Sequence, residues 1–137
     1  MKRIGVDTNV VVSFVTDRDP RQQARAAELF GAATSSEHVI VLHLSVITEA
    51  VYVLCNVYDE KPHVVSAVMR DLMSLPGVVT AAQVEWPAIW SSWPRHLEDF
   101  GDACLTAAAT ADTFDALATF DVAFAKQARR LGVATYW

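Results

Sequence analysis

Short apolar runs alternate with longer amphipathic segments along the chain. Runs rich in aliphatic and β-branched residues predict buried strands at 3–6, 39–42, 78–80, 117–120 and 133–136. The segments between them predict helices at 21–33, from Ser45 onwards, at 62–75, between Pro87 and Pro94, at 100–111 and at 122–130. Because helices and short strands alternate, we expect an α/β fold, a three-layer sandwich in which helices cover both faces of a parallel sheet of four or five strands.

The ends of several helices have signals of their own. Asp19 can cap a helix that has Pro20 at its first position, and Ser45 can cap the helix after the second strand. Pro76-Gly77 ends one helix and Gly132 follows another, as is usual where helices terminate. No repeat, linker or low-complexity tract separates these elements. The pattern therefore predicts a single domain over residues 1–137.

Composition narrows the class of protein. Hydrophobic residues make up 53% of the chain and charged residues 20%, which suits a folded domain with one core. No apolar run is long enough to span a bilayer and no basic-then-apolar leader opens the sequence, so we expect a soluble, cytoplasmic protein without a membrane partner. Cys55 and Cys104 lie in apolar stretches without other ligands nearby, and we expect reduced thiols in the core.

The net charge of −5 argues against tight, non-specific binding to nucleic acid, because such binders usually present a basic face. It does not exclude a nuclease, since a carboxylate metal site is itself acidic until cations neutralise it. Arg18, Arg21 and Arg25 are a local exception. They can form a basic strip for RNA phosphates, or simply a solvated helix face.

Acidic residues occur where the predicted strands end. Asp7 follows the first strand and Asp121 the fourth, each before helix-competent sequence, at the edge where sites form in α/β proteins. Glu49 is expected in the first turn of the helix after the second strand, near that edge. Asp99 and Asp102 are three residues apart at a helix start and share one face. Converging carboxylates repel one another and raise one another's pKa values, a conflict that a divalent cation removes.

The ligands on offer are all oxygen atoms, with no Cys or His at suitable spacing. Such a set favours Mg²⁺ or Mn²⁺ over Zn²⁺. A metal ion held in this way can lower the pKa of a bound water and stabilise charge on a phosphoryl group. The acids therefore point to phosphodiester hydrolysis.

Several of these residues also have structural interpretations. Asp7, Asp99 and Asp121 can cap the helices that follow them, and Glu49 can be a solvated acid near a helix dipole. A separate stripe recurs at the spacing of one helical face: Trp86, Trp90 and Trp93. Core packing is the default explanation of the stripe, and a protein interface or a base-stacking surface is the alternative. The sequence leaves that choice open.

Four acidic segments occur together, and in order, in a known family. They are Asp7-Thr8-Asn9-Val10 after an apolar strand, Glu49 in the second helix, Asp99-Phe100-Gly101-Asp102-Ala103 opening a later helix, and Thr119-Phe120-Asp121 after the fourth strand. This set resembles the PIN domains of VapC type. The resemblance runs from the first strand to the last.

The resemblance implies a Mg²⁺-dependent endoribonuclease that hydrolyses RNA phosphodiester bonds, with Mn²⁺ able to substitute. The implied catalytic acids are Asp7, Glu49, Asp102 and Asp121. The implied metal ligands are Asp7, Asp102, Asp121 and, as a further acid, Asp99, and the side chains expected to orient them are Thr8, Asn9 and Thr119. Val122-Ala123-Phe124 lacks the acid that relatives often have two positions after Asp121, which argues against a fully occupied second metal position.

The resemblance also implies partners. A VapC-type protein is the toxin of a type II toxin–antitoxin pair, so we expect a homodimer and an antitoxin whose carboxyl-terminal segment covers the groove. The RNA target does not follow from the sequence, and substrate-binding residues stay unassigned.

Three other functions compete with a nuclease. A haloacid-dehalogenase-like phosphatase with Asp7 as nucleophile would need a second Asp two residues on, where this chain has Asn9. A receiver-like signalling module would need an acidic pair near the first strand and a Lys after the last, and neither is present. A PIN-like module that binds RNA or protein without cleaving it satisfies the same sequence.

Overall fold

The computed structural model describes all of residues 1–137, in which seven helices alternate with four strands. In chain order the elements are β1 (Arg3–Val6), α1 (Thr8–Val15), α2 (Pro20–Thr34), β2 (Val39–His43), α3 (Leu44–Asn56), α4 (Pro62–Met73), β3 (Val78–Ala81), α5 (Trp86–Ser92), α6 (Phe100–Thr110), β4 (Ala116–Ala118) and α7 (Val122–Arg130). The predicted α/β fold is confirmed, and most elements begin and end within two residues of their predicted limits.

The start of α3 differs from the prediction. The helix begins at Leu44, and its cap is His43, whose side chain accepts a hydrogen bond from the Ser45 amide. The opposite ring nitrogen of His43 lies 2.9 Å from the Gln83 carbonyl oxygen, so this buried ring is satisfied on both sides. Ser45 is therefore not the cap. Glu49 falls in the second turn of α3 instead of the first.

The strands form one parallel sheet in the order β3-β2-β1-β4. The predicted fifth strand is reduced to a bridge, in which the Leu117 amide donates to the Ala134 carbonyl and the Tyr136 amide donates to the Leu117 carbonyl. The reason is the length of β4, which has three residues and so offers little free edge. The sheet therefore has four strands, and β4 ends at Ala118, before its predicted limit.

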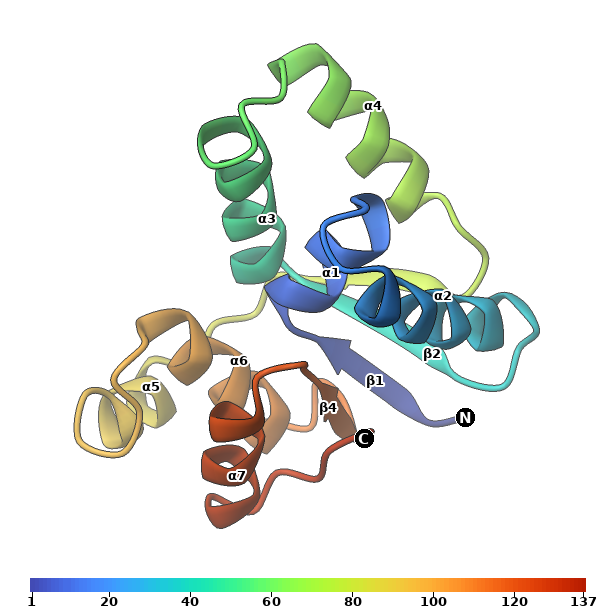
Figure 1. Cartoon of the computed structure of the whole chain (residues 1–137). Coiled ribbons are helices and arrows are strands. Elements are labelled where there is room, and N and C mark those ends of the chain that lie inside the picture. Colours follow the sequence, from blue (N-terminus) through green and yellow to red (C-terminus); the bar gives the residue numbers. More distant parts are fainter.

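The strand order determines where the helices lie. The chain moves from β1 outwards to β3 and then returns to the other side of β1 to form β4. Right-handed crossovers place the helices of the first part on one face and those of the second part on the other. Figure 1 shows this division, with α1, α2 and α4 on one side of the sheet and α6 and α7 on the opposite side. The carboxyl ends of β1 and β4 meet where the direction reverses, which is where α/β sheets bind ligands.

One hydrophobic cluster of 31 buried residues supports both layers, which agrees with the single core expected from composition. Gly5 in β1 is required because a Cβ there would come within 2.5 Å of the Phe114 ring. Cys55 and Cys104 are free thiols that pack, partly buried, against the cluster. None of the helices has the length and hydropathy that a membrane span requires.

Candidate active site

Asp7 occupies the junction between β1 and α1, with 9% of its surface exposed. Its Oδ1 accepts a hydrogen bond from the Thr8 amide at 2.8 Å. Its Oδ2 accepts bonds from Thr119 Oγ1 at 2.7 Å and from Asn9 Nδ2 at 3.2 Å. A carboxylate has about four acceptor positions, so three donors hold the Asp7 side chain in one orientation and still leave room for another ligand.

Asn9 and Thr119 join the ends of β1 and β4. The Oδ1 of Asn9 accepts a hydrogen bond from the Phe120 amide at 3.1 Å, and its Nδ2 lies 3.3 Å from Thr119 Oγ1. Thr119 Oγ1 also accepts from the Asp121 amide at 3.1 Å. These hydrogen bonds between neutral groups tie the residues before Asp121 to the end of β1.

Three further acids lie at the starts of two helices, Asp99 and Asp102 at α6 and Asp121 at α7. Asp99 caps α6 by accepting from the Asp102 amide at 2.8 Å, and Asp121 caps α7 by accepting from the Phe124 amide at 3.0 Å. The capping interpretation is therefore confirmed for both, and each cap uses only one carboxylate oxygen. Asp102 lies in the first turn of α6, partly exposed. Both caps leave a carboxylate oxygen available to a ligand.

Glu49 reaches the site from α3. Its Oε2 accepts a hydrogen bond from the Thr8 hydroxyl at 3.0 Å, and the side chain is otherwise exposed. A Cβ at Gly101 would lie 3.2 Å from Glu49 Oε2 and 3.1 Å from Asp99 Oδ1. The glycine therefore gives these two carboxylates space where α3 faces α6.

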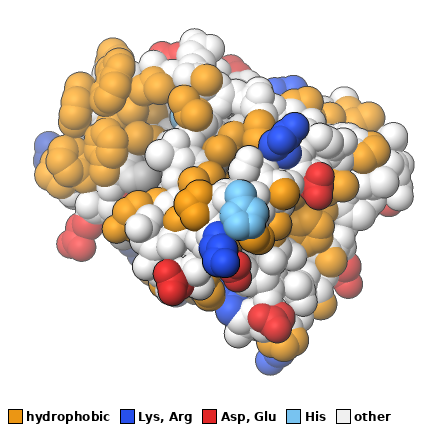
Figure 2. Space-filling model, turned by 90° about the horizontal axis from the view of Figure 1, so that it is seen from above, with side chains coloured by type: hydrophobic (Ala, Val, Ile, Leu, Met, Phe, Trp, Pro, Cys, Tyr) orange, Lys and Arg blue, Asp and Glu red, His pale blue; other side chains and the backbone are white.

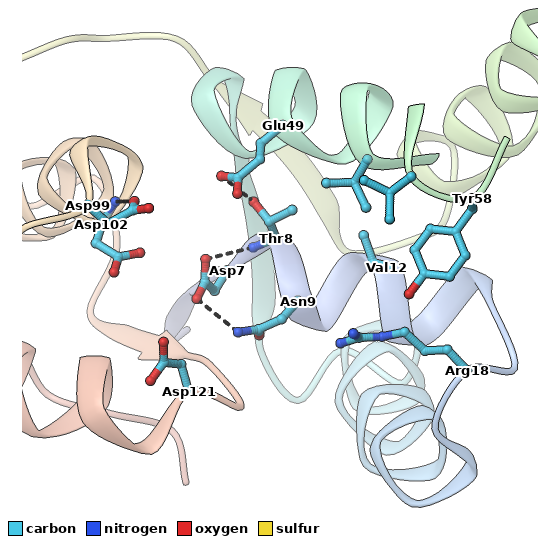
Figure 3. A pocket seen from close by; sticks show the side chains of 12 residues that line it. Asp7, Thr8, Asn9, Val12, Arg18, Glu49, Tyr58, Asp99, Asp102 and Asp121 are labelled. Atoms are coloured by element: carbon cyan, nitrogen blue, oxygen red, sulfur yellow. Dashed lines mark hydrogen bonds between the residues drawn. The ribbon is translucent and has the colours of Figure 1, made fainter. Parts of the chain in front are cut away.

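All five acids line a single cavity of about 460 Å³ (Figure 3). Figure 3 shows Asp7, Asp99, Asp102 and Asp121 around one end of it and Arg18 and Tyr58 at the other. The full lining is Asp7, Thr8, Asn9, Val12, Arg18, Glu49, Val53, Val57, Tyr58, Asp99, Asp102 and Asp121. The structure therefore brings every predicted acid into one pocket with an acidic end and an apolar end.

The acids impose a clear electrostatic cost on one another. Burial, reinforced by the charges of Asp7, Asp99, Asp121 and Glu49, raises the pKa of Asp102 to about 8. Burial also raises the pKa of Asp7 to about 6, although hydrogen bonds from Thr119 and Thr8 oppose this rise. The pocket thus concentrates negative charge that its own residues do not neutralise.

The donor set fits a hard divalent cation. The groups are all oxygen donors, and burial together with the neighbouring acids raises the pKa values of Asp7 and Asp102, so a bound cation would favour their ionised forms. No three His, Cys, Asp or Glu side chains are arranged closely enough to hold one ion as they stand. A metal ion would thus have to draw side chains at the pocket surface towards itself, and Asp102 and Asp121 are exposed enough to move.

The sequence of residues 3–123 matches the model of a protein family described as PIN domain. The chain belongs to the PIN-domain family. A comparison with curated protein sequences finds no significant match. The acids at the ends of β1 and β4 are therefore acids of a PIN domain. This family generally consists of metal-dependent nucleases.

Two solved structures are similar to this PIN domain. VapC20 from Mycobacterium tuberculosis, described as a Sarcin-Ricin loop cleaving toxin, aligns with a TM-score of 0.64 and 23% identity over 90% of this chain and 93% of that chain. VapBC2 from Rickettsia felis, bound to a DNA fragment from their promoter, aligns with a TM-score of 0.65 and 16% identity over 97% of this chain and 96% of that chain. At these identities the likeness establishes the fold.

The apolar end of the pocket was not predicted from the sequence. Val53 on α3 and Val57 just after its end follow Glu49 at intervals of four, and Val12 follows Thr8 in the same way on α1. Residues at this spacing share a helix face, so the signal was present once Thr8 and Glu49 had been assigned to the site. On both helices the polar residue lies at the acidic end of the pocket and the valines lie at its apolar end.

Two of the three tryptophans in the stripe are not core, whereas Trp93 packs against the hydrophobic cluster. Trp86 is 50% exposed and Trp90 is 55% exposed, while Trp93 lies just after α5 and is partly buried. The Trp86 and Trp90 rings stack with centroids 5.5 Å apart, and Phe100, 38% exposed, packs beside them. Figure 2 shows hydrophobic side chains gathered over the end of the PIN domain that carries α5. None of these rings lines the acidic pocket.

Proposed function

We propose that this PIN domain is a Mg²⁺-dependent endoribonuclease and the toxin of a type II toxin–antitoxin pair. The observation that carries the proposal is the convergence of Asp7, Asp102 and Asp121, from three separate elements, on one pocket at the switch point of the sheet. Family membership and a fold shared with VapC20 support it.

Each side chain has a definite part in this proposal. Asp7, Asp102 and Asp121 would hold Mg²⁺, with Asp99 as the further acid, and Mn²⁺ would substitute. When bound, the ion supplies an activated water and charge stabilisation for the phosphoryl group. Thr119 and Asn9 keep Asp7 in one orientation through their hydrogen bonds to Oδ2. Glu49, fixed through Oε2 by Thr8, keeps Oε1 free to accept a proton from the attacking water.

The direct test is cleavage of RNA by the purified protein. With millimolar Mg²⁺ we expect internal cleavage of a mixture of tRNA, rRNA and mRNA fragments, and with excess EDTA none. Mn²⁺ added after EDTA should restore cleavage, whereas Ca²⁺ of the same charge serves as the control for mere neutralisation. Binding of the same RNA without cleavage under any metal would support the alternative, a PIN-like binding module.

Metal and pH are expected to act together on stability. The folded pKa values of Asp7 and Asp102, about 6 and about 8, lie above the ordinary value of 3.8. At pH values between the ordinary pKa and the raised pKa of each group, the folded state holds more protons than the unfolded state. The free energy of unfolding of the metal-free protein therefore falls as the pH rises from 5 to 8. Because Asp102 is partly exposed, solvent screening limits the loss to a few degrees of melting temperature.

Mg²⁺ should restore that stability at pH 8 and do little at pH 5, where Asp7 and Asp102 are mostly protonated. A tenfold excess over the dissociation constant contributes about 1.4 kcal/mol, or roughly 4 °C in a domain of this size. Mn²⁺ should give the larger shift at equal concentration. Thermal melts at both pH values measure the effect, and a melting temperature insensitive to either ion at pH 8 would contradict a site in the free protein.

The proposal includes two protein partners. The first is an antitoxin, whose carboxyl-terminal segment would enter the pocket. The second is another copy of the chain, and the exposed ring cluster of Trp86, Trp90 and Phe100 supports a homodimer because exposed apolar patches of this kind usually mark protein interfaces. Sedimentation as a monomer at micromolar concentration would contradict the dimer.

A further inference from the structure

Arg18 is the single Lys or Arg among the residues that line the acidic pocket. Its Nε and Nη2 atoms lie 3.3 and 3.1 Å from Ser13 Oγ, and Nη2 lies 3.3 Å from Gln22 Oε1. Ser13 is fully buried and itself donates to Gln22 Oε1 at 2.9 Å, so the guanidinium is tied to a fixed support. Both acceptors are neutral. Arg18 therefore presents a positive charge without an ion-pair partner in a cavity that five acids also line, and Figure 3 shows it reaching into that cavity beside Tyr58.

Arg25 on α2 is held by aromatic rings. Its Cζ lies 5.0 Å from the centre of the Phe120 ring and 4.6 Å from the Trp137 ring, and these two rings stack at 4.8 Å. Such cation–π contacts orient a guanidinium without neutralising its charge. Phe120 directly precedes Asp121, so Arg25 lies beside the β4 end of the acidic site.

A second cavity, of about 230 Å³, includes Arg25 in its lining. It is lined by Asp19, Arg21, Gln22 and Arg25. Gln22 belongs to this cavity and also accepts the hydrogen bond from Arg18, so the two hollows adjoin along the start of α2. Asp19 is the one acid here, and its Oδ1 is engaged by the Gln22 amide as the helix cap. Because Arg21 and Arg25 face a single acid, Asp19, this surface is locally positive.

We propose that Arg18 and Arg25 are backbone phosphate contacts that guide single-stranded RNA to the acidic pocket, an inference that rests on the proposed function. A chain of net charge −5 with acids in its pocket repels a polyanion, so affinity must come from cations at the edge of that pocket. A guanidinium binds two phosphate oxygens at once, and neither arginine has to leave a carboxylate partner to do so. For Arg18 and Arg25, these contacts decide between the two interpretations of the basic strip that the sequence left open.

An acidic segment of a protein partner would satisfy the same arginines less well. Such a segment would bring further carboxylates towards Asp7 and Asp121, whose charges already raise the pKa of Asp102. RNA instead brings phosphates to acids whose chemistry suits a phosphodiester when a divalent cation is bound. We therefore assign the surface to RNA and treat a protein ligand as an opposing outcome.

The experiment measures RNA binding independently of cleavage. Fluorescence anisotropy of a labelled single-stranded RNA is recorded with the Asp102→Asn protein at fixed Mg²⁺ and increasing KCl. Arg18→Gln and Arg25→Gln should each weaken binding roughly tenfold and reduce the slope of log K against log salt by about 0.7, the value for one lost single-strand phosphate contact. Arg18→Lys and Arg25→Lys keep the charge and should keep the slope. Arg70→Gln, on the exposed surface of α4, is the matched control and should change neither quantity.

The salt slope separates a phosphate contact from a structural role, because a loosened loop lowers affinity without removing a counterion. Slopes unchanged in both Gln variants would overturn the inference, as would an equal change in Arg70→Gln. Loss of affinity for a partner protein with RNA binding intact would also overturn it and assign the surface to that protein. If the slopes are reduced in the Gln variants but the wild-type protein cleaves no RNA, the phosphate contacts would be supported. Only the proposed nuclease activity would then be contradicted.

Discussion

Asp102→Asn is expected to reduce Mg²⁺-dependent RNA cleavage by roughly 10³-fold or more, because it removes a charged oxygen that would bind the metal. The fold should be unaffected. The α6 cap is a hydrogen bond from the Asp102 backbone amide to Asp99, which the substitution retains. Initial rates of RNA cleavage at saturating Mg²⁺ measure the effect.

Two further measurements make this result specific. Asp102 carries a raised pKa through burial and the surrounding acids, so the neutral Asn should leave the metal-free protein equally or more stable at pH 8. Asp112→Asn is a matched control, since Asp112 is exposed, outside the pocket, and at a φ of 60° that Asn also tolerates. Cleavage by Asp102→Asn at the wild-type rate would show that Asp102 is not part of the site.

The second large effect concerns inhibition by the proposed antitoxin. Asp7→Asn combined with Asp102→Asn should weaken binding of its tail by roughly 30-fold or more, because an Arg inserted among the acids would lose its charged partners. Mg²⁺ competes for the same oxygens, so raising it should weaken binding to the wild-type protein. A titration of both proteins with the product of the neighbouring gene, at several Mg²⁺ concentrations, measures this competition.

The structure also indicates where the apolar part of such a tail would lie. The pocket that holds the acids continues between Val12 and Val53 towards Tyr58, whereas the tryptophan stripe lies outside it. Val53→Asp should therefore weaken tail binding, and Trp90→Ala, at an exposed position away from the pocket, should not. Equal affinities of wild type and the double Asn variant at every Mg²⁺ concentration would show that the partner does not act through the carboxylates.

The local sequence was sufficient to predict both ends of α7 and the start of α2. Asp19-Pro20 defines the beginning of α2, and Val122 to Arg130 forms α7 over its predicted length. Both have caps and apolar faces within their own residues. The acids could be assigned to one edge for a similar reason, since a strand followed at once by a helix puts its last residues at the carboxyl edge of a parallel sheet.

The contacts between these segments were decided only by the tertiary structure. Thr119 bonds Asp7 across 112 positions of the chain, and α3 begins at Leu44, capped by a His43 ring that Gln83 also holds. The length of the fifth strand depended on how much free edge β4 offers. Arg18 lies in the acidic pocket because buried Ser13 and Gln22 hold it there. Residue type and spacing determined which groups this protein brings to the carboxyl edge of its sheet, but their distances, burial and pKa values depend on packing between segments that are remote in the sequence.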